Sequence, residues 1–324
     1  MRHAAQEPRG QLWAVVLAGG EGLRLRPLIE RLYGEPRPKQ FTSLVGARSL
    51  LRQTLDRVQL AVPSHRTVVV GLTDHDGYLG ESLDDDAWRR ILLQPEDRGT
   101  GAGVLLPAHW IHARDPDAIV AVFPSDHFVD DEQALMQHVA DVAELLEEHP
   151  EWLVLLGASA SDPEPDYGWI EPGEILGWSP AGEPISRVRQ FIEKPSPLTA
   201  HACLQKGWLW NTFAFVARAS LLVEIGAGFL PEVHAPLSQL RPFEHTRASV
   251  DALRRAYAFF PKVSFSRAVF EFCPPGMVVS RLPALEWSDW GTPERVVKSL
   301  RKAGRLPRWF GESDLVGTAP LERR

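Results

Sequence analysis

Cysteine is scarce in this sequence: Cys203 and Cys273 are the only two among 324 residues. Two cysteines cannot form the disulfide framework of a small secreted domain, and they fit a reducing compartment. Two arginines before the apolar run at residues 12–18 imitate a signal peptide only faintly, and the run is better explained as a buried first strand. We therefore expect a cytoplasmic protein.

An excess of basic charge and a long apolar run are also missing. The 35 Lys and Arg residues face 42 Asp and Glu residues, which gives a net charge of −7. Proteins that bind nucleic acids or membrane surfaces rely on an excess of positive charge, so we expect neither partner. No apolar stretch approaches the ~18 residues that span a bilayer. The 44% of hydrophobic residues can bury a core in one large domain or two small ones.

Short apolar runs recur along the first half of the chain. They lie at residues 12–18, 66–71, 89–95, 117–126 and 151–158, bounded by Gly, Pro or Asp. Such continuous runs suit strands that are buried on both faces of a mainly parallel sheet. Helical periodicity falls between them, as at residues 131–148. This alternation predicts an α/β layered fold with right-handed crossovers.

The second half of the chain has a different pattern. Residues 186–195 alternate between polar and apolar, and residues 207–217 are rich in aromatics, which indicates mixed or antiparallel strands. Proline and glycine cluster at residues 161–184, which favours a long functional loop over a linker between independent domains. No internal repeat is present, and no hexapeptide repeat predicts a parallel β-helix.

A glycine-rich, basic stretch follows the first predicted strand. Its glycines at positions 19, 20 and 22 would let backbone N–H groups turn towards a ligand, and phosphates are the usual ligands of such a nest. Five basic residues outnumber two acidic ones between positions 24 and 39. In open α/β sheets, ligands bind beyond the carboxyl ends of strands, where this loop lies. A tight β-to-α turn beside a solvated basic helix is the alternative explanation.

Two familiar phosphate-binding loops do not fit this stretch. A dinucleotide-binding fingerprint needs glycine at the third position of G-x-G-x-x-G, and Leu25 stands there. A Walker loop needs lysine and Ser or Thr directly after the last glycine, and this sequence has neither. The missing third glycine argues against a Rossmann dehydrogenase.

Six motifs in the same order resemble those of the sugar-1-phosphate nucleotidyltransferases, with the mannose-1-phosphate guanylyltransferases as the nearest subgroup. They are G-G-x-G-x-R-L-x-P-L (19–28) followed by P-K-Q-F (38–41), FPSDHF (123–128), YGWIE (167–171), FIEKP (191–195), WNTFAF (210–215) and EWSDWG (286–291). The resemblance runs from about residue 13 to residue 295. It implies a Rossmann-like, GT-A-type nucleotidyltransferase fold, with a mixed, mostly parallel sheet and helices on both faces.

The resemblance also implies a reaction and a division of the chain. A sugar-1-phosphate, with mannose-1-phosphate favoured, would attack the α-phosphorus of a nucleoside triphosphate, with GTP favoured, and release pyrophosphate. The division is an N-terminal tail (1–11), a nucleotidyltransferase domain (12–295) with a nucleotide-binding half (12–160) and a sugar-binding half (161–295), and a C-terminal tail (296–324). The resemblance leaves a homodimer open.

Charged side chains in these motifs would share the chemistry, by the same resemblance. Arg24 and Lys39 would bind the triphosphate, and Lys194 would neutralise the sugar phosphate. Asp126 and Asp289 would hold a Mg²⁺ ion that bridges the nucleotide and the attacking phosphate. The alternatives are surface ion pairs for the cations and helix N-capping for the aspartates.

Further residues of the motifs would bind substrate. Those that the resemblance implies are Gly19, Gly20, Gly22, Arg98, Gly99, Thr100, Gly168, Glu171, Glu193 and Asn211. The first three would cradle phosphate, and the next three lie in the loop that would read the base. The last four would surround the sugar, where carboxylates and an amide can accept hydrogen bonds from hydroxyl groups.

Four positions depart from the guanylyltransferase pattern. Leu23 stands where Thr or Ser is usual, and Gln94 replaces the common Glu. Phe213 takes the place of a glycine beside the sugar, and Ser266 removes an Asp. Because these positions bear on specificity, the same chemistry with UTP, CTP or dTTP and another sugar phosphate stays open. A catalytically weak paralogue that binds a nucleotide sugar and regulates a partner is the other alternative.

Overall fold

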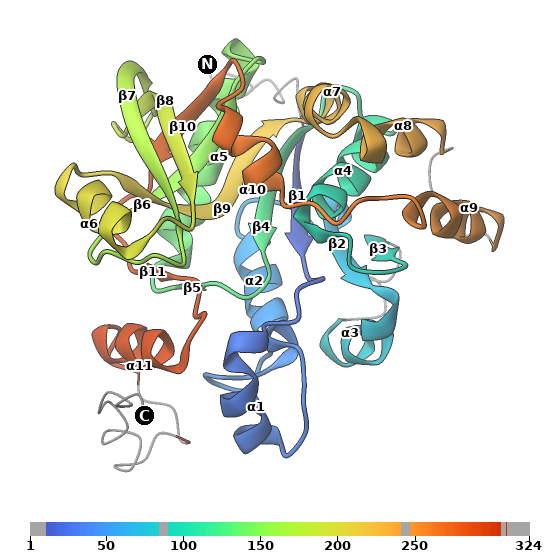
Figure 1. Ribbon diagram of the computed structural model, residues 1–324, viewed down its shortest axis with the longest axis horizontal. Helices are drawn as coiled ribbons and strands as arrows, with labels where there is room; N and C mark the ends of the chain where they lie inside the picture. Colours follow the sequence, from blue (N-terminus) through green and yellow to red (C-terminus); the bar gives the residue numbers. More distant parts are fainter. Residues whose placement is uncertain (1–10, 84–89, 241–246, 306–308, 310–324) are drawn as a thin grey trace, which may run out of the picture.

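The computed structural model describes residues 11–83, 90–240, 247–305 and 309 of the chain. Its centre is a nine-stranded sheet in the order β3-β2-β1-β4-β9-β6-β10-β8-β7, with a further pairing between β9 and β7 (Figure 1). The strands are β1 (Leu12–Leu17), β2 (Thr67–Leu72), β3 (Ile91–Gln94), β4 (Ile119–Pro124), β6 (Leu153–Ser159), β7 (Gly168–Trp178), β8 (Pro184–Glu193), β9 (Leu209–Arg218) and β10 (Met277–Arg281). A small second sheet pairs β5 (Phe128–Val129) with β11 (Trp287–Ser288).

The apolar runs of the first half form the parallel part of the sheet, as the sequence predicts. Strand β1 lies between β2 and β4 and is parallel to both. Val15 and Val16 are fully buried on opposite faces of it, in separate clusters of apolar side chains. Only β8 and β9 run against the other strands of this sheet, and β9 separates β4 from β6. The expected mixed, mostly parallel sheet is confirmed.

Helices cover both faces of the sheet, which is also as expected. One face carries α2 (Leu50–Val58), α3 (Asp76–Ser82), α5 (Glu132–Glu148) and α6 (Pro197–Gln205). The other face carries α4 (Gly99–His112), α7 (Ala219–Phe229), α8 (Pro231–Gln239), α9 (Arg247–Tyr257) and the short α10 (Phe265–Ala268). In the part of the chain that the structure describes, no helix is long and apolar enough to cross a membrane.

A third apolar cluster joins two segments from opposite ends of the chain. Helix α1 (Arg26–Tyr33) contributes Ile29, and α11 (Pro293–Lys302) contributes Val296, both fully buried. Both helices lie in the lower part of Figure 1, towards which the arrows of β1 and β4 point. Helix α11 crosses the boundary drawn at residue 295, so residues just beyond it pack on the domain.

The long loop predicted at residues 161–184 is wrong for about half of its length. Residues Gly168–Trp178 form β7, the last strand of the sheet. The pairing of β7 with β8 shifts register on both sides of Pro172 and again before Gly177. Proline and glycine are tolerated in edge strands at such bulges, which is why a Pro- and Gly-rich segment can still pair.

Candidate functional site

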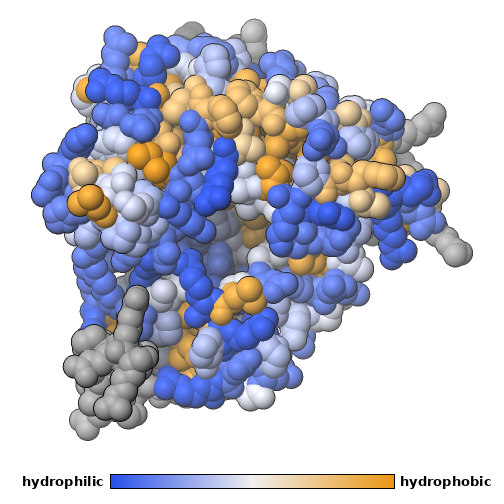
Figure 2. Space-filling view, in the orientation of Figure 1, coloured by the Kyte–Doolittle hydropathy of each residue, from blue (hydrophilic) through white to orange (hydrophobic). Residues whose placement is uncertain are grey.

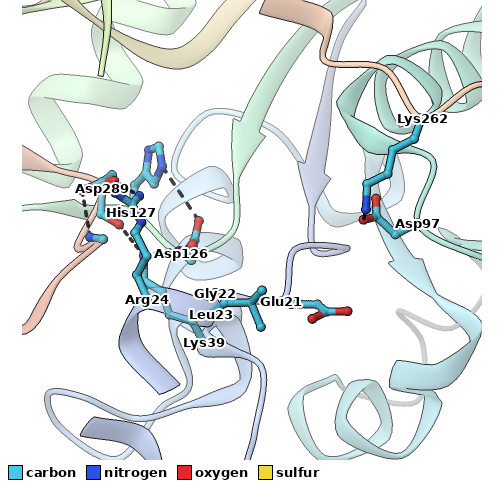
Figure 3. A pocket seen from close by; sticks show the side chains of 11 residues that line it. Glu21, Gly22, Leu23, Arg24, Lys39, Asp97, Asp126, His127, Lys262 and Asp289 are labelled. Atoms are coloured by element: carbon cyan, nitrogen blue, oxygen red, sulfur yellow. Dashed lines mark hydrogen bonds and ion pairs between the residues drawn. The ribbon is translucent and has the colours of Figure 1, made fainter. Parts of the chain in front are cut away.

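A pocket of about 510 Å³ opens beyond the carboxyl ends of β1 and β4 (Figure 3). Its lining residues are Glu21, Gly22, Leu23, Arg24, Lys39, Asp97, Asp126, His127, Lys262, Asp289 and Gly291. The space-filling view is hollowed at the centre of this face, and the residues around the hollow are mostly hydrophilic (Figure 2). Five residues predicted from the sequence to bind phosphate or metal therefore meet in one pocket.

The glycine-rich loop is shaped by contacts with the segment around Lys39. Gly22 has φ +61°, and a Cβ added there would lie 2.5 Å from the Cβ of Lys39. The side-chain amide of Gln40 donates to the carbonyl oxygens of Ala18 at 2.8 Å and Gly20 at 2.7 Å. Gln40 thus fixes the loop that follows β1, a role that the sequence motif alone did not reveal.

Replacing Gly22 with alanine should lower the free energy of unfolding by roughly 2–4 kcal/mol, because the left-handed backbone and the contact with Lys39 both exclude a side chain. Gly34 also has a positive φ, +75°, but nothing lies within 4 Å of its Cβ position. Gly34→Ala should therefore cost only about 1 kcal/mol. Urea denaturation of both variants tests this, and equal losses would show that the contact with Lys39 has no effect.

Lys39 is the most deeply buried cation in the pocket, with 3% of its surface exposed. It belongs to the short 3-10 helix Lys39–Phe41. Its ammonium group donates to Asp126 Oδ2 at 2.9 Å and to the backbone oxygen of Asp289. One lysine therefore joins two segments that are far apart in the sequence, the end of β4 and the end of β11.

The backbone of the turn that carries Asp126 accepts hydrogen bonds from two side chains of α2. Thr54 donates through its hydroxyl to the carbonyl oxygen of Ser125 at 3.2 Å. Arg57 donates to the carbonyl oxygen of His127 at 3.3 Å and pairs with Glu132 at 3.3 Å. These contacts hold the backbone on both sides of Asp126, so its side chain projects into the pocket. Asp131, not Asp126, caps α5, which argues against capping as the role of Asp126.

Two of the pocket aspartates, Asp126 and Asp289, are held in the ionised form. Burial by itself would raise their pKa values, but the positive charge of Lys39 offsets it and keeps the pKa of Asp126 below its usual value. Lys39 and Arg295 act in the same way on the pKa of Asp289. Burial lowers the pKa of His127 to about 4, so this imidazole is neutral at physiological pH. The pocket is therefore built from fixed charges.

Those fixed charges leave a deficit that a metal ion would fill. The cations that line the pocket are Arg24, Lys39 and Lys262, and the anions are Glu21, Asp97, Asp126 and Asp289. With a net charge of −1, these side chains alone cannot neutralise a polyphosphate. Mg²⁺ typically binds one or two carboxylates together with substrate phosphates. Among the described residues no group of three or more His, Cys, Asp or Glu could hold a metal.

The two predicted metal ligands differ in how many contacts their carboxylate oxygens already make. Asp126 Oδ1 has no described contact closer than the His127 ring at 3.9 Å, so it can accept a cation. Asp289 Oδ1 accepts from the Tyr167 hydroxyl at 2.9 Å, the backbone N–H of Gly291 at 2.8 Å and Arg295 at 3.1 Å. Its Oδ2 accepts from Arg24 at 3.1 Å and from Arg295 at 3.3 Å, so both of its oxygens already contact cations. Asp126 Oδ1 is therefore the uncommitted oxygen that would hold Mg²⁺, and Asp289 would join it by exchanging a contact with an arginine.

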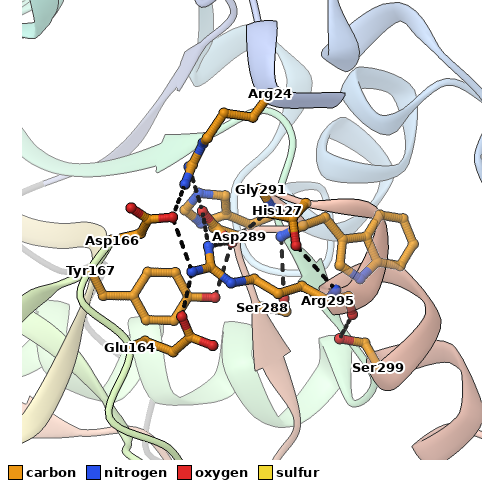
Figure 4. A network of polar contacts seen from close by, with 12 residues as sticks. Arg24, His127, Glu164, Asp166, Tyr167, Ser288, Asp289, Gly291, Arg295 and Ser299 are labelled. Atoms are coloured by element: carbon orange, nitrogen blue, oxygen red, sulfur yellow. Dashed lines mark hydrogen bonds and ion pairs between the residues drawn. The ribbon is translucent and has the colours of Figure 1, made fainter. Parts of the chain in front are cut away.

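Arg24 lies in a network of charged groups beside this pocket (Figure 4). Its guanidinium donates to Asp166 at 2.6 Å and to Asp289 at 3.1 Å. Arg295 from α11 donates to the same two carboxylates and to Glu164. Sequence reasoning missed Arg295, Glu164 and Asp166, because no motif or spacing connects α11 with the segment before β7.

Of the residues predicted to bind the sugar, three lie together on the sheet and Glu171 lies apart from them. Gly168 is the register partner of Glu193 on β8 and of Asn211 on β9. A Cβ at Gly168 would lie 2.9 Å from Glu193 Oε2 and 3.1 Å from the Asn211 Cβ, so the three positions share one surface. Glu171 lies apart, because side chains alternate along β7 and it points to the other face, where it pairs with Arg189 at 3.5 Å.

Lys194 follows directly after β8 and is exposed, with φ +51°. Burial raises the pKa of the adjacent Glu193, while a hydrogen bond with Ser266 counteracts it. Phe213 also has a positive φ, +56°. Its backbone N–H donates to the side-chain amide oxygen of Asn211 at 3.1 Å. Two of the departures noted in the sequence, Phe213 and Ser266, thus touch the predicted sugar-binding residues directly.

The predicted base loop is held by the segment before α10. Gly99 has φ +80°, and its Cβ would lie 2.4 Å from the carbonyl oxygen of Val263. The Thr100 hydroxyl accepts from the N–H of Phe265 at 2.8 Å. The Arg98 guanidinium forms an ion pair with the Glu96 carboxylate at 2.8 Å. These three predicted residues have structural contacts and do not line the pocket.

One other side chain of this region lines the pocket. Asp97 lines the pocket and pairs with Lys262, neither of which sequence reasoning identified. Gln94 is buried at the end of β3, where its side-chain oxygen accepts from the Tyr257 hydroxyl at 3.1 Å. Its side-chain nitrogen lies 3.1 Å from the Cβ position of Gly19.

Comparisons with known proteins identify relatives along most of this chain. Alginate biosynthesis protein AlgA from Pseudomonas fluorescens is 33% identical over 281 residues, which cover 86% of this chain and 56% of AlgA. A mannose-1-phosphate guanylyltransferase from Escherichia coli K12 is 30% identical over 88% of this chain and 59% of its own length. A crystal structure described as mannose-1-phosphate geranyltransferase from Thermus thermophilus has a TM-score of 0.72 at 30% identity, over 87% of this chain and 76% of that one.

This chain spans little more than half the length of the curated relatives it matches. The family model nevertheless covers nearly all of the sheet, together with the pocket and α11. Residues 13–304 fit the model of the Nucleotidyl transferase family, and the chain therefore belongs to that family.

Proposed function

We propose that this protein transfers the nucleotidyl group of a nucleoside triphosphate to a sugar-1-phosphate, releasing pyrophosphate and forming a nucleotide sugar. GTP and mannose-1-phosphate are the favoured substrates, because a relative at 30% identity bears the name mannose-1-phosphate guanylyltransferase. The observation that carries the proposal is the buried Lys39, whose ammonium group joins the Asp126 carboxylate to the Asp289 backbone in the pocket.

The nucleotide half would act by positioning and neutralising phosphate groups. Two anions must meet in this reaction, so most of the catalysis comes from orientation and electrostatic stabilisation. The planar guanidinium of Arg24 can bind two phosphate oxygens at once, while the ammonium group of Lys39 acts as a point charge. Asp126 and Asp289 would hold Mg²⁺, which supplies further positive charge to the phosphates. Backbone groups of Gly19, Gly20 and Gly22 would approach the phosphates most closely.

The base and the sugar would bind on either side of the phosphates. Since the Arg98 side chain turns to Glu96, the loop at residues 94–103 would read the base through its backbone and Gln94. Glu193, Asn211 and Gly168 would surround the sugar, with Glu193 accepting hydrogen bonds from hydroxyl groups. Lys194 would neutralise the attacking phosphate. An oxygen of that phosphate bonds to the α-phosphorus as the bond to pyrophosphate breaks, and the leaving group carries the charge away.

The experiment that tests this function is pyrophosphate release by the purified chain with Mg²⁺. A grid of GTP, ATP, UTP, CTP and dTTP against several hexose-1-phosphates identifies the substrate pair. Release that requires GTP and mannose-1-phosphate together would support the favoured pair. Release with another pair keeps the chemistry and changes the substrates. No release, with nucleotide-sugar binding still measurable, would favour the regulatory paralogue.

Replacing Lys194 with alanine should raise KM for the sugar phosphate by roughly 10- to 100-fold, because one charge-assisted contact to phosphate is lost. KM for the nucleoside triphosphate should change less than about twofold. Lys206, an exposed lysine at the end of α6, provides the matched control, and Lys206→Ala should leave both values unchanged. An unchanged KM for the sugar phosphate in the Lys194 variant would remove it from the site.

A further inference from the structure

Arg295 is a nearly buried arginine that joins three carboxylates from two segments of the chain. Its side chain is 11% exposed and donates to Glu164, to Asp166 at 3.3 Å and to Asp289 at 3.1 Å. The guanidinium also lies 4.5 Å from the centre of the Tyr167 ring. Arg295 is not among the residues that line the pocket, so any effect on a ligand must pass through its partners.

Two of those partners hold Arg24 from either side. Nη1 of Arg24 donates to Asp166 at 2.6 Å, and Nη2 donates to Asp289 at 3.1 Å. An arginine carries five N–H donors, so these contacts leave the remaining donors for a ligand. The Arg24 side chain is 46% exposed and lines the pocket, which gives a ligand access to those donors.

The backbone of Gly291 provides a third contact to Arg24. A Cβ at this position would lie 2.6 Å from Nη2 of Arg24 and 2.9 Å from its Cζ. The guanidinium therefore lies directly against the glycine. With two carboxylates and one backbone surface around it, Arg24 is oriented before any ligand arrives.

The two carboxylates need a second cation to stay in place. Asp166 and Asp289 carry like charges and both contact the Arg24 guanidinium, so a single positive charge would leave them partly unbalanced. Arg295 contacts both and so supplies a second positive charge to the pair. Its contact with Glu164 also anchors the segment before β7, which carries Asp166.

We propose that Arg295 is a positioning residue for phosphate binding: by fastening Asp166 and Asp289 on both sides of Arg24, it directs the free N–H groups of Arg24 into the pocket. This inference rests on the proposed function, in which Arg24 binds the triphosphate. It adds that α11 and the segment at residues 164–167 belong to the phosphate site, although neither supplies a phosphate ligand.

The test is calorimetric binding of tripolyphosphate with Mg²⁺ to the full chain, which needs neither the correct base nor the correct sugar. Arg295→Lys keeps the charge and the helix but replaces the planar guanidinium fork with a single ammonium centre, which does not match the spacing of the three carboxylates. It should raise Kd about tenfold, as expected for a misdirected charge-assisted contact. Arg24→Ala should raise Kd at least as much. Lys298 on the same helix pairs with Asp162 on the same segment and touches neither Arg24 nor Asp289. Lys298→Gln should leave Kd unchanged.

A second readout separates positioning from a general loss of structure. In turnover assays, Arg295→Lys should raise KM for the triphosphate and leave KM for the sugar phosphate unchanged, with the thermal midpoint close to that of the wild type. If Arg24→Ala weakens tripolyphosphate binding and Arg295→Lys does not, the inference is wrong and the proposed function stands. If the wild-type chain does not bind tripolyphosphate, the phosphate role of Arg24 and the proposed function both fail.

Discussion

Replacing Asp126 with asparagine should lower kcat by roughly 10³-fold, because the substitution removes the charge that we assign to Mg²⁺ and keeps the size of the side chain. Asparagine can still accept the hydrogen bond from Lys39, so the fold should survive. The free energy of unfolding should fall by about 1–3 kcal/mol, because buried Lys39 loses its ionised partner. Pyrophosphate release and urea denaturation measure the two effects separately.

The matched control for this variant lies at the opposite end of the same strand. Asp117 is exposed just before β4, whereas Asp126 lies just after it. Asp117→Asn should retain wild-type turnover and stability. A wild-type rate in the Asp126 variant, with the control unchanged, would exclude Asp126 from the reaction.

Replacing Lys39 with methionine should lower kcat/KM for the triphosphate by roughly 10³-fold, because the pocket loses its most buried positive charge. Methionine is of similar length and fills the space beside Gly22. The variant also removes the charge that now offsets the effect of burial on the pKa of Asp126. That pKa should rise, so the residual activity should be lost at a higher pH on the acidic side than in the wild type.

Steady-state kinetics across pH would test both parts of this expectation. Lys206→Met, at an exposed position outside the pocket, serves as the control for loss of a lysine. An unchanged acid limb in the Lys39 variant would mean that Lys39 does not set the ionisation of Asp126. An unchanged kcat/KM would remove Lys39 from triphosphate binding.

Much of the fold follows from the sequence because the signals are local. Continuous apolar runs can only be buried on both faces, and those that end in Gly or Asp predict the carboxyl edge where ligands bind. That rule brings Gly22 and Asp126 together, since each follows a parallel strand. Lys39 and Asp289 could be added only through the motifs, because neither is next to a strand of the large sheet.

What the sequence could not predict depends on contacts between distant segments. Arg295 has the pattern of an ordinary surface residue of an amphipathic helix until α11 packs beside the segment that precedes β7, where it meets Glu164 and Asp166. Strand β7 itself was hidden by its proline and glycines, which an edge strand tolerates at bulges. The side of the sheet on which Glu171 lies follows from the register of β7, and register is set by pairing rather than by composition.

The central claim is that the pocket transfers a nucleotidyl group from the α-phosphorus of a nucleoside triphosphate to a sugar phosphate. The most direct measurement follows the label from GTP that carries radioactive phosphorus at the α-position, with unlabelled mannose-1-phosphate and Mg²⁺, by separating the products on an ion-exchange column. The account predicts that the label moves to a nucleotide sugar in step with pyrophosphate release. Label that appears only in GDP or GMP, or that stays in the triphosphate with every nucleotide and sugar phosphate tried, would contradict it.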